Sequence, residues 1–159
     1  MMSVNAVKKA TLFLTGFCVY LSIEVCWKGY SYPLMGIISG IAVLILDRLN
    51  NEISWDLDLA WQCIFGSCLI TGFELVIGEI AKRTTLLPIM WDYTNVPLNF
   101  DGVICLPFSI IWMLLSSVAI FLADAINYYI FEDTDVPYYI LFGKYRFEFK
   151  RKKCDEVKL

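Results

Sequence analysis

Four apolar stretches of near-membrane length limit the possible folds of this chain more than any other feature. They are residues 10–27, 32–46, 59–78 and 103–123 of a sequence of 159 residues. A membrane-spanning helix needs roughly 20 mainly apolar residues. With 58% hydrophobic residues and a mean hydropathy of +0.63, the chain is also more apolar than usual soluble domains. A soluble domain of this length could bury one core but not four such stretches.

Helices are the natural solution for these stretches, because lipid cannot satisfy backbone polar groups. A transmembrane barrel would need short segments of alternating hydrophobicity instead. We predict an all-α integral membrane four-helix bundle, with helices at about 10–27, 32–49, 58–79 and 103–128. A structured outer loop joins the third and fourth helices. The second stretch is short enough to be re-entrant, but we favour a span that Tyr30 and Tyr32 anchor at the interface.

We expect one transmembrane domain, residues 1–131, followed by a cytoplasmic aromatic and basic tail, residues 132–159. Aromatic and charged residues alternate over 145–150, which is typical of a short extended or interfacial segment. The basic run 150–153 would bind anionic lipid at roughly 1 kcal/mol per residue. The same run could instead dock a soluble partner, although we favour the lipid anchor.

The distribution of basic residues predicts the orientation through the positive-inside rule. An even number of spans places most of them on the cytoplasmic side, namely Lys8, Lys9, Arg48, Lys144, Arg146, Lys150, Arg151, Lys152, Lys153 and Lys158. Lys28, Lys82 and Arg83 then face outward. We therefore predict a multi-pass protein of the cell membrane with both termini in the cytoplasm. The first stretch lacks an Ala-x-Ala cleavage signal, so we interpret it as a retained helix.

Composition argues against several classes of function. The net charge of −3 offers no basic field for nucleic acid, and the chain has no histidine. None of the six cysteines forms a CxxC pair, so we predict no disulfide framework and no metal site. The sequence has no P-loop, no GxSxG and no HExxH motif. We therefore predict neither an enzyme nor a cofactor.

Two carboxylates, Glu24 and Glu74, lie a few residues before the outer ends of the first and third helices. At a rise of about 1.5 Å per residue, both would sit at a similar shallow depth. A carboxylate within a span indicates a functional site by default, here one for a cation or polar solute. Two structural roles remain open: Glu24 can pair with Lys28 at i,i+4, and Glu74 can bond the outer loop or extend to the interface.

The outer loop, residues 90–102, mixes aromatic rings, amides and carboxylates. In a ligand site, the polar side chains would contact the solute and the rings would shape a lid. In a structural loop, which we favour, the same rings form an interfacial belt and the prolines and glycine define turns. The candidate ligand residues are Asp92, Asn95 and Asn99, and the candidate shaping residues are Trp91, Tyr93, Pro97 and Gly102.

Gly36 and Gly40 form a GxxxG motif inside the second apolar stretch. Small residues at this spacing let two helix backbones approach closely. The motif predicts helix packing, either within one chain or across the interface of a homo-oligomer.

The loop and its flanks resemble a known family. The residues Trp91-Asp92-Tyr93-Thr94-Asn95, then 97–99, 102–109 and Trp112, are similar to the signature WDYSN-x-P-x-N-x-x-G-x-I-C-L-x-F-S-x-x-W. That signature belongs to bacterial membrane proteins catalogued as ABC-transporter permeases ("putative ABC-transporter type IV"). Thr94 replaces the usual serine, and Glu24 and Glu74 resemble glutamates of that family. The resemblance covers about residues 24–112.

The resemblance implies a bacterial integral membrane protein associated with transport. The chain has no nucleotide-binding domain, so a permease role would require a homo-oligomer and a separate ATP-binding subunit. Our functional hypothesis is a permease-like protein with an outer-leaflet polar site made of Glu24, Glu74, Asp92, Asn95 and Asn99. The alternative is a non-transporting scaffold in the membrane, whose GxxxG face and basic tail recruit partners.

Overall fold

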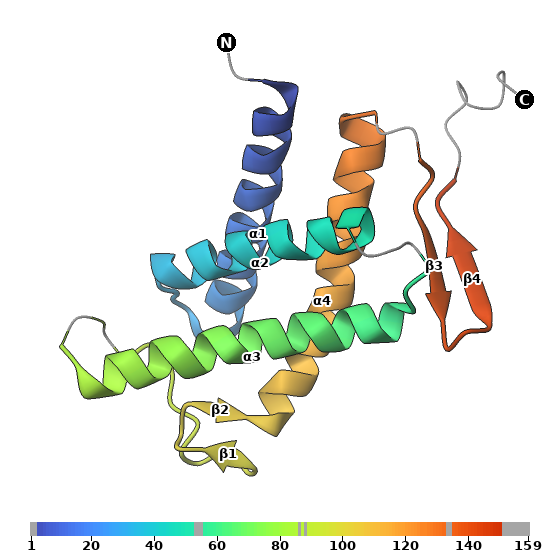
Figure 1. The fold of residues 1–159 in the computed structure, drawn as a ribbon. Coiled ribbons are helices and arrows are strands. Elements are labelled where there is room, and N and C mark those ends of the chain that lie inside the picture. Colours follow the sequence, from blue (N-terminus) through green and yellow to red (C-terminus); the bar gives the residue numbers. More distant parts are fainter. Residues whose placement is uncertain (1–2, 53–55, 86, 88, 133–134, 151–159) are drawn as a thin grey trace, which may run out of the picture.

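The computed structural model describes residues 3–52, 56–85, 87, 89–132 and 135–150. For residues 50–52 it describes the backbone only. Helices dominate this part of the chain (Figure 1). They are α1 (Val4–Lys28), α2 (Pro33–Glu52), α3 (Leu59–Arg83) and α4 (Leu106–Ala125), which continues into a π-helical turn η1 (Ile126–Ile130). Four strands complete the described structure: β1 (Asn99–Phe100), β2 (Ile104–Cys105), β3 (Tyr138–Leu141) and β4 (Tyr145–Glu148).

Each helix ends later than its predicted apolar stretch, and α1 also begins earlier. Helix α1 begins at Val4 because the side chain of Ser3 accepts a hydrogen bond from the Ala6 N–H (3.2 Å). It ends before Gly29, whose φ of 82° suits a left-handed C-terminal cap. Helix α3 continues through Arg83, and α4 begins at Leu106, later than predicted. Polar residues flank an apolar stretch without interrupting its helix, so hydropathy alone misplaces the ends.

The prediction of an all-α protein is wrong in one respect, because two small hairpins are present. Strands β1 and β2 form an antiparallel pair in the connection between α3 and α4, where β1 belongs to the outer loop and β2 follows it. Strands β3 and β4 form a longer pair in the tail, with Tyr138 opposite Glu148 and Leu141 opposite Tyr145. The alternation of aromatic and charged residues in the tail favoured either a short extended segment or an interfacial one, and β4 agrees with the first of these.

Helices α1 and α4 run in opposite directions, and α2 and α3 cross them in the view of Figure 1. The start of α1 lies at the top, and the end of α2, the start of α3 and the hairpin β3–β4 lie toward the right; we call this upper and right-hand part the tail end. The connection between α1 and α2, the end of α3 and the hairpin β1–β2 lie toward the lower left; we call this the loop end. Each helix therefore runs from one end of the molecule to the other.

The GxxxG glycines pack within the chain. A Cβ atom at Gly36 would lie 2.7 Å from Cδ2 of Phe17, and one at Gly40 would lie 2.6 Å from Cδ2 of Phe13. Both rings belong to α1. The Ser39 hydroxyl also donates a hydrogen bond to the Gly16 carbonyl (2.9 Å). The motif thus joins α2 to α1, which is the first of the two roles that the sequence left open.

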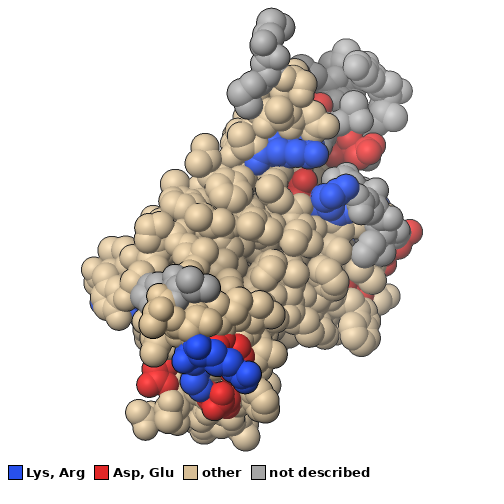
Figure 2. All heavy atoms as spheres, turned by 60° about the vertical axis from the view of Figure 1, so that its left-hand side comes forward, with Lys and Arg blue, Asp and Glu red and all other residues tan. Residues whose placement is uncertain are grey.

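Three of the described helices are long and apolar enough to cross a membrane: Val4–Lys28, Leu59–Arg83 and Leu106–Ile130. Helix α2, of which the side chains are described only as far as Leu49, is not among these three. Figure 2 shows charged side chains gathered toward the two ends of one face, with uncharged surface between them. Exposed leucines such as Leu14 and Leu114 lie on the outside of this helical region. Such a surface is typical of a protein surrounded by lipid.

Candidate functional site

Glu74 is the central polar residue of the loop end. It lies on α3, and only 3% of its surface is exposed. Its Oε1 accepts a hydrogen bond from the Tyr93 hydroxyl (2.9 Å), and its Oε2 accepts one from Nε1 of Trp112 (2.9 Å). One carboxylate therefore links α3, the outer loop and α4. This contact agrees with the structural role that the sequence left open, in which Glu74 bonds the loop.

Tyr93 attaches the loop to this carboxylate. Its ring stacks on Phe108 with 4.6 Å between centroids, and its N–H donates to the Gly102 carbonyl (2.8 Å). Burial, together with the charge of Glu74, raises the pKa of the Tyr93 phenol. The hydroxyl therefore keeps its proton and remains a donor to Glu74 over the ordinary pH range.

Glu24 is the second carboxylate of the loop end, and it lies on α1. Its Oε1 lies 2.7 Å from Nζ of Lys28, which confirms the predicted i,i+4 pair. The Ser31 hydroxyl donates to Oε2, and the Tyr20 hydroxyl makes a long contact with Oε1 (3.5 Å). The side chain is 13% exposed, so this ion pair is shielded from bulk solvent on most sides.

A cavity of about 760 Å³ opens at the loop end between α1, α4 and the outer loop. It falls within the usual size range of small-molecule sites. Its charged lining residues, among those described, are Glu24, Lys28, Glu74 and Asp92. Its aromatic lining residues are Tyr20, Trp27, Tyr30, Trp91, Tyr93, Phe108 and Trp112. The cavity thus joins carboxylates from α1, α3 and the loop to a largely aromatic wall.

A second, smaller cavity of about 70 Å³ continues from the same side chains into the helices. Glu74, Trp112 and Leu115 line both cavities. The smaller cavity extends toward the tail end as far as Leu46 and Ala119. Glu74 therefore lies at the junction between a wide opening and a narrow interior space.

The loop holds its own shape through short-range hydrogen bonds. Oδ1 of Asp92 accepts from the N–H (2.8 Å) and the hydroxyl of Thr94, and these bonds hold the pKa of Asp92 below its usual range. Asn99 donates to the Val96 carbonyl (2.7 Å) and accepts from the Gly102 N–H (3.0 Å). Gly102 has a φ of 65°, and a Cβ there would lie 2.6 Å from the Thr94 hydroxyl. Glycine is therefore required at this turn.

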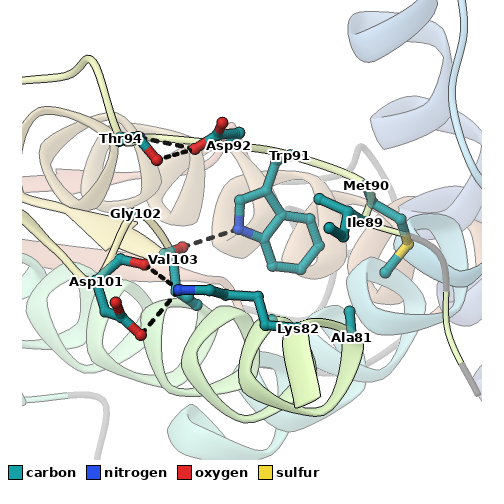
Figure 3. Close-up of a pocket in the computed structure, with 11 residues that line it drawn as sticks. Ala81, Lys82, Ile89, Met90, Trp91, Asp92, Thr94, Asp101, Gly102 and Val103 are labelled. Carbon is teal, nitrogen blue, oxygen red and sulfur yellow. Dashed lines mark hydrogen bonds and ion pairs between the residues drawn. The ribbon is translucent and has the colours of Figure 1, made fainter. Parts of the chain in front are cut away.

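The other side of Trp91 faces a pocket of about 150 Å³ (Figure 3). Nε1 of Trp91 donates to the Val103 carbonyl (2.8 Å). Figure 3 shows the ammonium of Lys82 between the backbone carbonyl (2.7 Å) and the carboxylate (2.8 Å) of Asp101. The Lys82 ammonium holds the pKa of Asp101 below its usual range. The two Lys82 contacts fasten the loop to α3 on the side away from the large cavity, whereas the Trp91 bond lies within the connection between α3 and α4.

The comparisons with known proteins identify the family. The family model described as "Putative ABC-transporter type IV" matches residues 5–142. The chain belongs to this family. No curated protein and no solved structure matches the chain. The match extends on both sides of the segment 24–112 that carries the sequence resemblance, so it includes α1 and the strand β3.

The structure brings only part of the predicted polar site together. Glu24, Glu74 and Asp92 line the large cavity, as do the predicted shaping residues Trp91 and Tyr93. Asn95 and Asn99 are exposed and do not line it, and Asn99 serves the turn described above. Pro97 is exposed in the same turn, and its predicted role in shaping the loop stays a prediction.

Sequence reasoning missed several residues of this site. Tyr20 and Ser31 contact Glu24, and Trp112 contacts Glu74, yet none was a predicted site residue. Tyr20 precedes Glu24 by one helical turn, a spacing that could have revealed it. Trp112 stands in the family signature, which was the available signal for it. Among the described residues, no group of three or more Asp, Glu, Cys or His side chains could hold a metal ion.

Proposed function

We propose that this chain is a permease-like, transport-associated protein of the bacterial cell membrane. In this proposal all four helices span the membrane, both termini lie in the cytoplasm and the loop end faces outward. The observation that carries the proposal is the pair of cavities that meet at Glu74. A wide outer space followed by a narrow inner one is the arrangement expected of an outward-open solute path.

The path would be closed toward the tail end by close helix packing. A Cβ at Gly66 would overlap the Ser116 side chain and lie 3.2 Å from Cδ2 of Leu46. These residues come from α3, α4 and α2, and Leu46 and Ser116 also line the inner cavity, so the three helices meet tightly at its wall. A small rotation among them would open the path to the other side, as in alternating access.

The tail end offers a firm surface for a coupling subunit. The hairpin β3–β4 is fixed to the connection before α3, since the Tyr138 hydroxyl donates to Asp56 (2.7 Å) and the Gly143 N–H donates to Asp58 (2.7 Å). We propose that an ATP-binding subunit docks at this end of a homo-oligomer. The family assignment supports this role, because ABC-type transport requires such a subunit and this chain supplies no nucleotide-binding motif.

The rival role, a scaffold that recruits partners through its GxxxG face, has less support. Gly36 and Gly40 already contact Phe17 and Phe13 of the same chain. That face of α2 is therefore covered by α1. The basic tail beyond residue 150 lies outside the described residues and keeps this alternative open to experiment.

The first test is purification of the tagged chain in mild detergent, followed by mass spectrometry of the proteins that accompany it. We expect an ATP-binding subunit in a fixed ratio to the chain. Recovery of the chain alone, or of scaffold-like partners that depend on residues 150–159, would contradict the permease role.

The second test examines the solute site itself. Native mass spectrometry of the chain in lipid nanodiscs, after incubation with a small-molecule extract of bacterial cells, should reveal a bound solute. Leu115→Trp fills the junction of the two cavities and should abolish that binding, whereas Leu114→Trp, on the exposed side of α4, should preserve it. Equal binding by both variants would contradict the proposed site.

A further inference from the structure

The ion pair at the wall of the large cavity already places an ammonium group in a defined setting. Nζ of Lys28 lies 2.7 Å from the Glu24 carboxylate and 4.9 Å from the centroid of the Tyr30 ring. An ammonium held by a carboxylate on one side and an aromatic face on the other is a recurrent mode of cation recognition. All three side chains line the cavity.

The charge balance of the cavity favours a cation over an anion. Among its described lining residues, Glu24, Glu74 and Asp92 carry carboxylates, and Lys28 is the cationic one. If Lys28 moves away from Glu24, the wall presents carboxylates and aromatic rings together. A cation with apolar substituents would satisfy both, because the rings attract its charge and cover its apolar surface.

Lys28 is able to move away. It is the last residue of α1, its side chain is 24% exposed, and Gly29 follows it with no heavy atom near its ideal Cβ position. The lysine ammonium sits at the end of a flexible four-carbon stem. Glu24 would keep its contact with the Ser31 hydroxyl while the lysine leaves, so its position does not depend on Lys28 alone.

We propose that the cavity binds the ammonium group of an organic cation between Glu24 and Tyr30, and that Lys28 is a built-in competitor for this position. This inference rests on the proposed solute site and assigns its ligand class. The ammonium comes either from a free solute or from the headgroup of a lipid. In both cases the ligand displaces Lys28, so removal of the lysine strengthens binding.

The test measures binding of benzyltrimethylammonium to the full chain in nanodiscs by isothermal titration calorimetry. We expect Lys28→Met to lower the Kd about ten-fold, which is the scale of one displaced ammonium interaction. Glu24→Gln should raise the Kd by about ten-fold or more. Lys82→Met is the matched control and should leave the Kd unchanged, since Lys82 pairs with Asp101 away from this cavity.

Nanodisc composition distinguishes the two sources of ammonium. If lipid headgroups occupy the position, binding of the probe should weaken in phosphatidylcholine discs relative to phosphatidylglycerol discs, with Glu24→Gln correcting for attraction to the lipid surface. Equal corrected affinity in both discs would assign the position to a free solute. Either result is compatible with the inference, provided that Lys28→Met strengthens binding.

The inference is overturned if Lys28→Met leaves the Kd unchanged or raises it, or if benzenesulfonate binds in a manner that requires Lys28. Thermal unfolding of each variant verifies that it is folded. If Glu24→Gln is unfolded, the Kd of Lys28→Met alone decides between the outcomes. If this test fails but Leu115→Trp still abolishes solute binding from the cell extract, the ammonium inference is wrong and the proposed solute site stands. Failure of both results would remove the proposed function as well.

Discussion

Carboxylates lie within or beside apolar helices at both ends of this molecule, but their surroundings differ. At the loop end, Glu24 and Glu74 border a cavity of about 760 Å³. At the tail end, Asp47 and Asp124 are 9% and 4% exposed and do not line that cavity. A carboxylate in an apolar segment is therefore insufficient to define a ligand site. The loop-end carboxylates differ from the tail-end ones because a cavity lies beside them.

The tail-end carboxylates accept hydrogen bonds that join neighbouring elements. Asp124 accepts a hydrogen bond from the Tyr139 hydroxyl (2.6 Å), which fixes strand β3 to α4, and Asp47 accepts one from Nδ2 of Asn127, which fixes α2 to η1. Burial beside Asp124 raises the pKa of the Tyr139 phenol, so this donor keeps its proton. Glu74 also joins neighbouring elements, through its bonds from Tyr93 and Trp112, but it does so at the base of a cavity.

The largest expected effect tests the double role of Glu74. Glu74→Ala leaves the buried donors of Tyr93 and Trp112 without their acceptor, and each such loss costs about 1–3 kcal/mol. We expect a destabilisation of about 3 kcal/mol in thermal unfolding of the detergent-solubilised protein. Glu74→Gln keeps one acceptor oxygen and should lose about half as much. Unchanged stability in both variants would remove Glu74 from its linking role.

The next effect concerns packing between α1 and α2. Gly40→Ala places a Cβ 2.9 Å from the Phe13 carbonyl oxygen and closer still to its ring, and overpacking of this kind costs about 1–3 kcal/mol. Gly72→Ala is the matched control, because nothing lies within 4 Å of its Cβ position, and it should stabilise α3 by about 0.5–1 kcal/mol. The measurement is again thermal unfolding. If Gly40→Ala has normal stability but an altered oligomeric state, the GxxxG motif forms an interface between two chains instead of packing α2 against α1.

The tail end should affect stability without affecting the solute. Tyr139→Phe removes one hydrogen bond to Asp124 and should destabilise the protein by about 1 kcal/mol. Its Kd for benzyltrimethylammonium should equal that of the wild type. A changed Kd would show that the two ends are coupled and would break the distinction drawn here.

The smallest effect is a pH dependence in the outer loop. Hydrogen bonds from Thr94 lower the pKa of Asp92, and Lys82 lowers that of Asp101. Their contribution to stability is therefore complete above the unfolded aspartate pKa of about 3.9 and is lost as the pH falls through the lowered values. The Tm of the wild type should fall between pH 5 and pH 3 more steeply than that of Thr94→Val. Parallel curves would contradict this role of Asp92.

Sequence reasoning predicted the apolar helices, the structured loop and the Glu24–Lys28 pair, because each depends on residues close together in the chain. It missed the contact between Glu74 and Trp112, which depends on how α3 crosses α4. It also assigned Asn99 to a ligand, whereas the amide satisfies backbone groups of its own turn. Amides prefer such local bonds in tight turns, a preference that residue type alone cannot separate from ligand binding.

Cysteine accessibility at Leu115 tests the central claim most directly, namely that a water-filled path from outside reaches the junction at Glu74. Leu115→Cys lines both cavities, and Leu114→Cys, exposed on the outside of α4, is its control; each is placed in a chain whose six native cysteines are replaced by alanine. In intact cells, a small membrane-impermeant methanethiosulfonate should label the first and not the second. Labelling of neither, or of Leu115→Cys only after permeabilisation, would contradict an outward-open path.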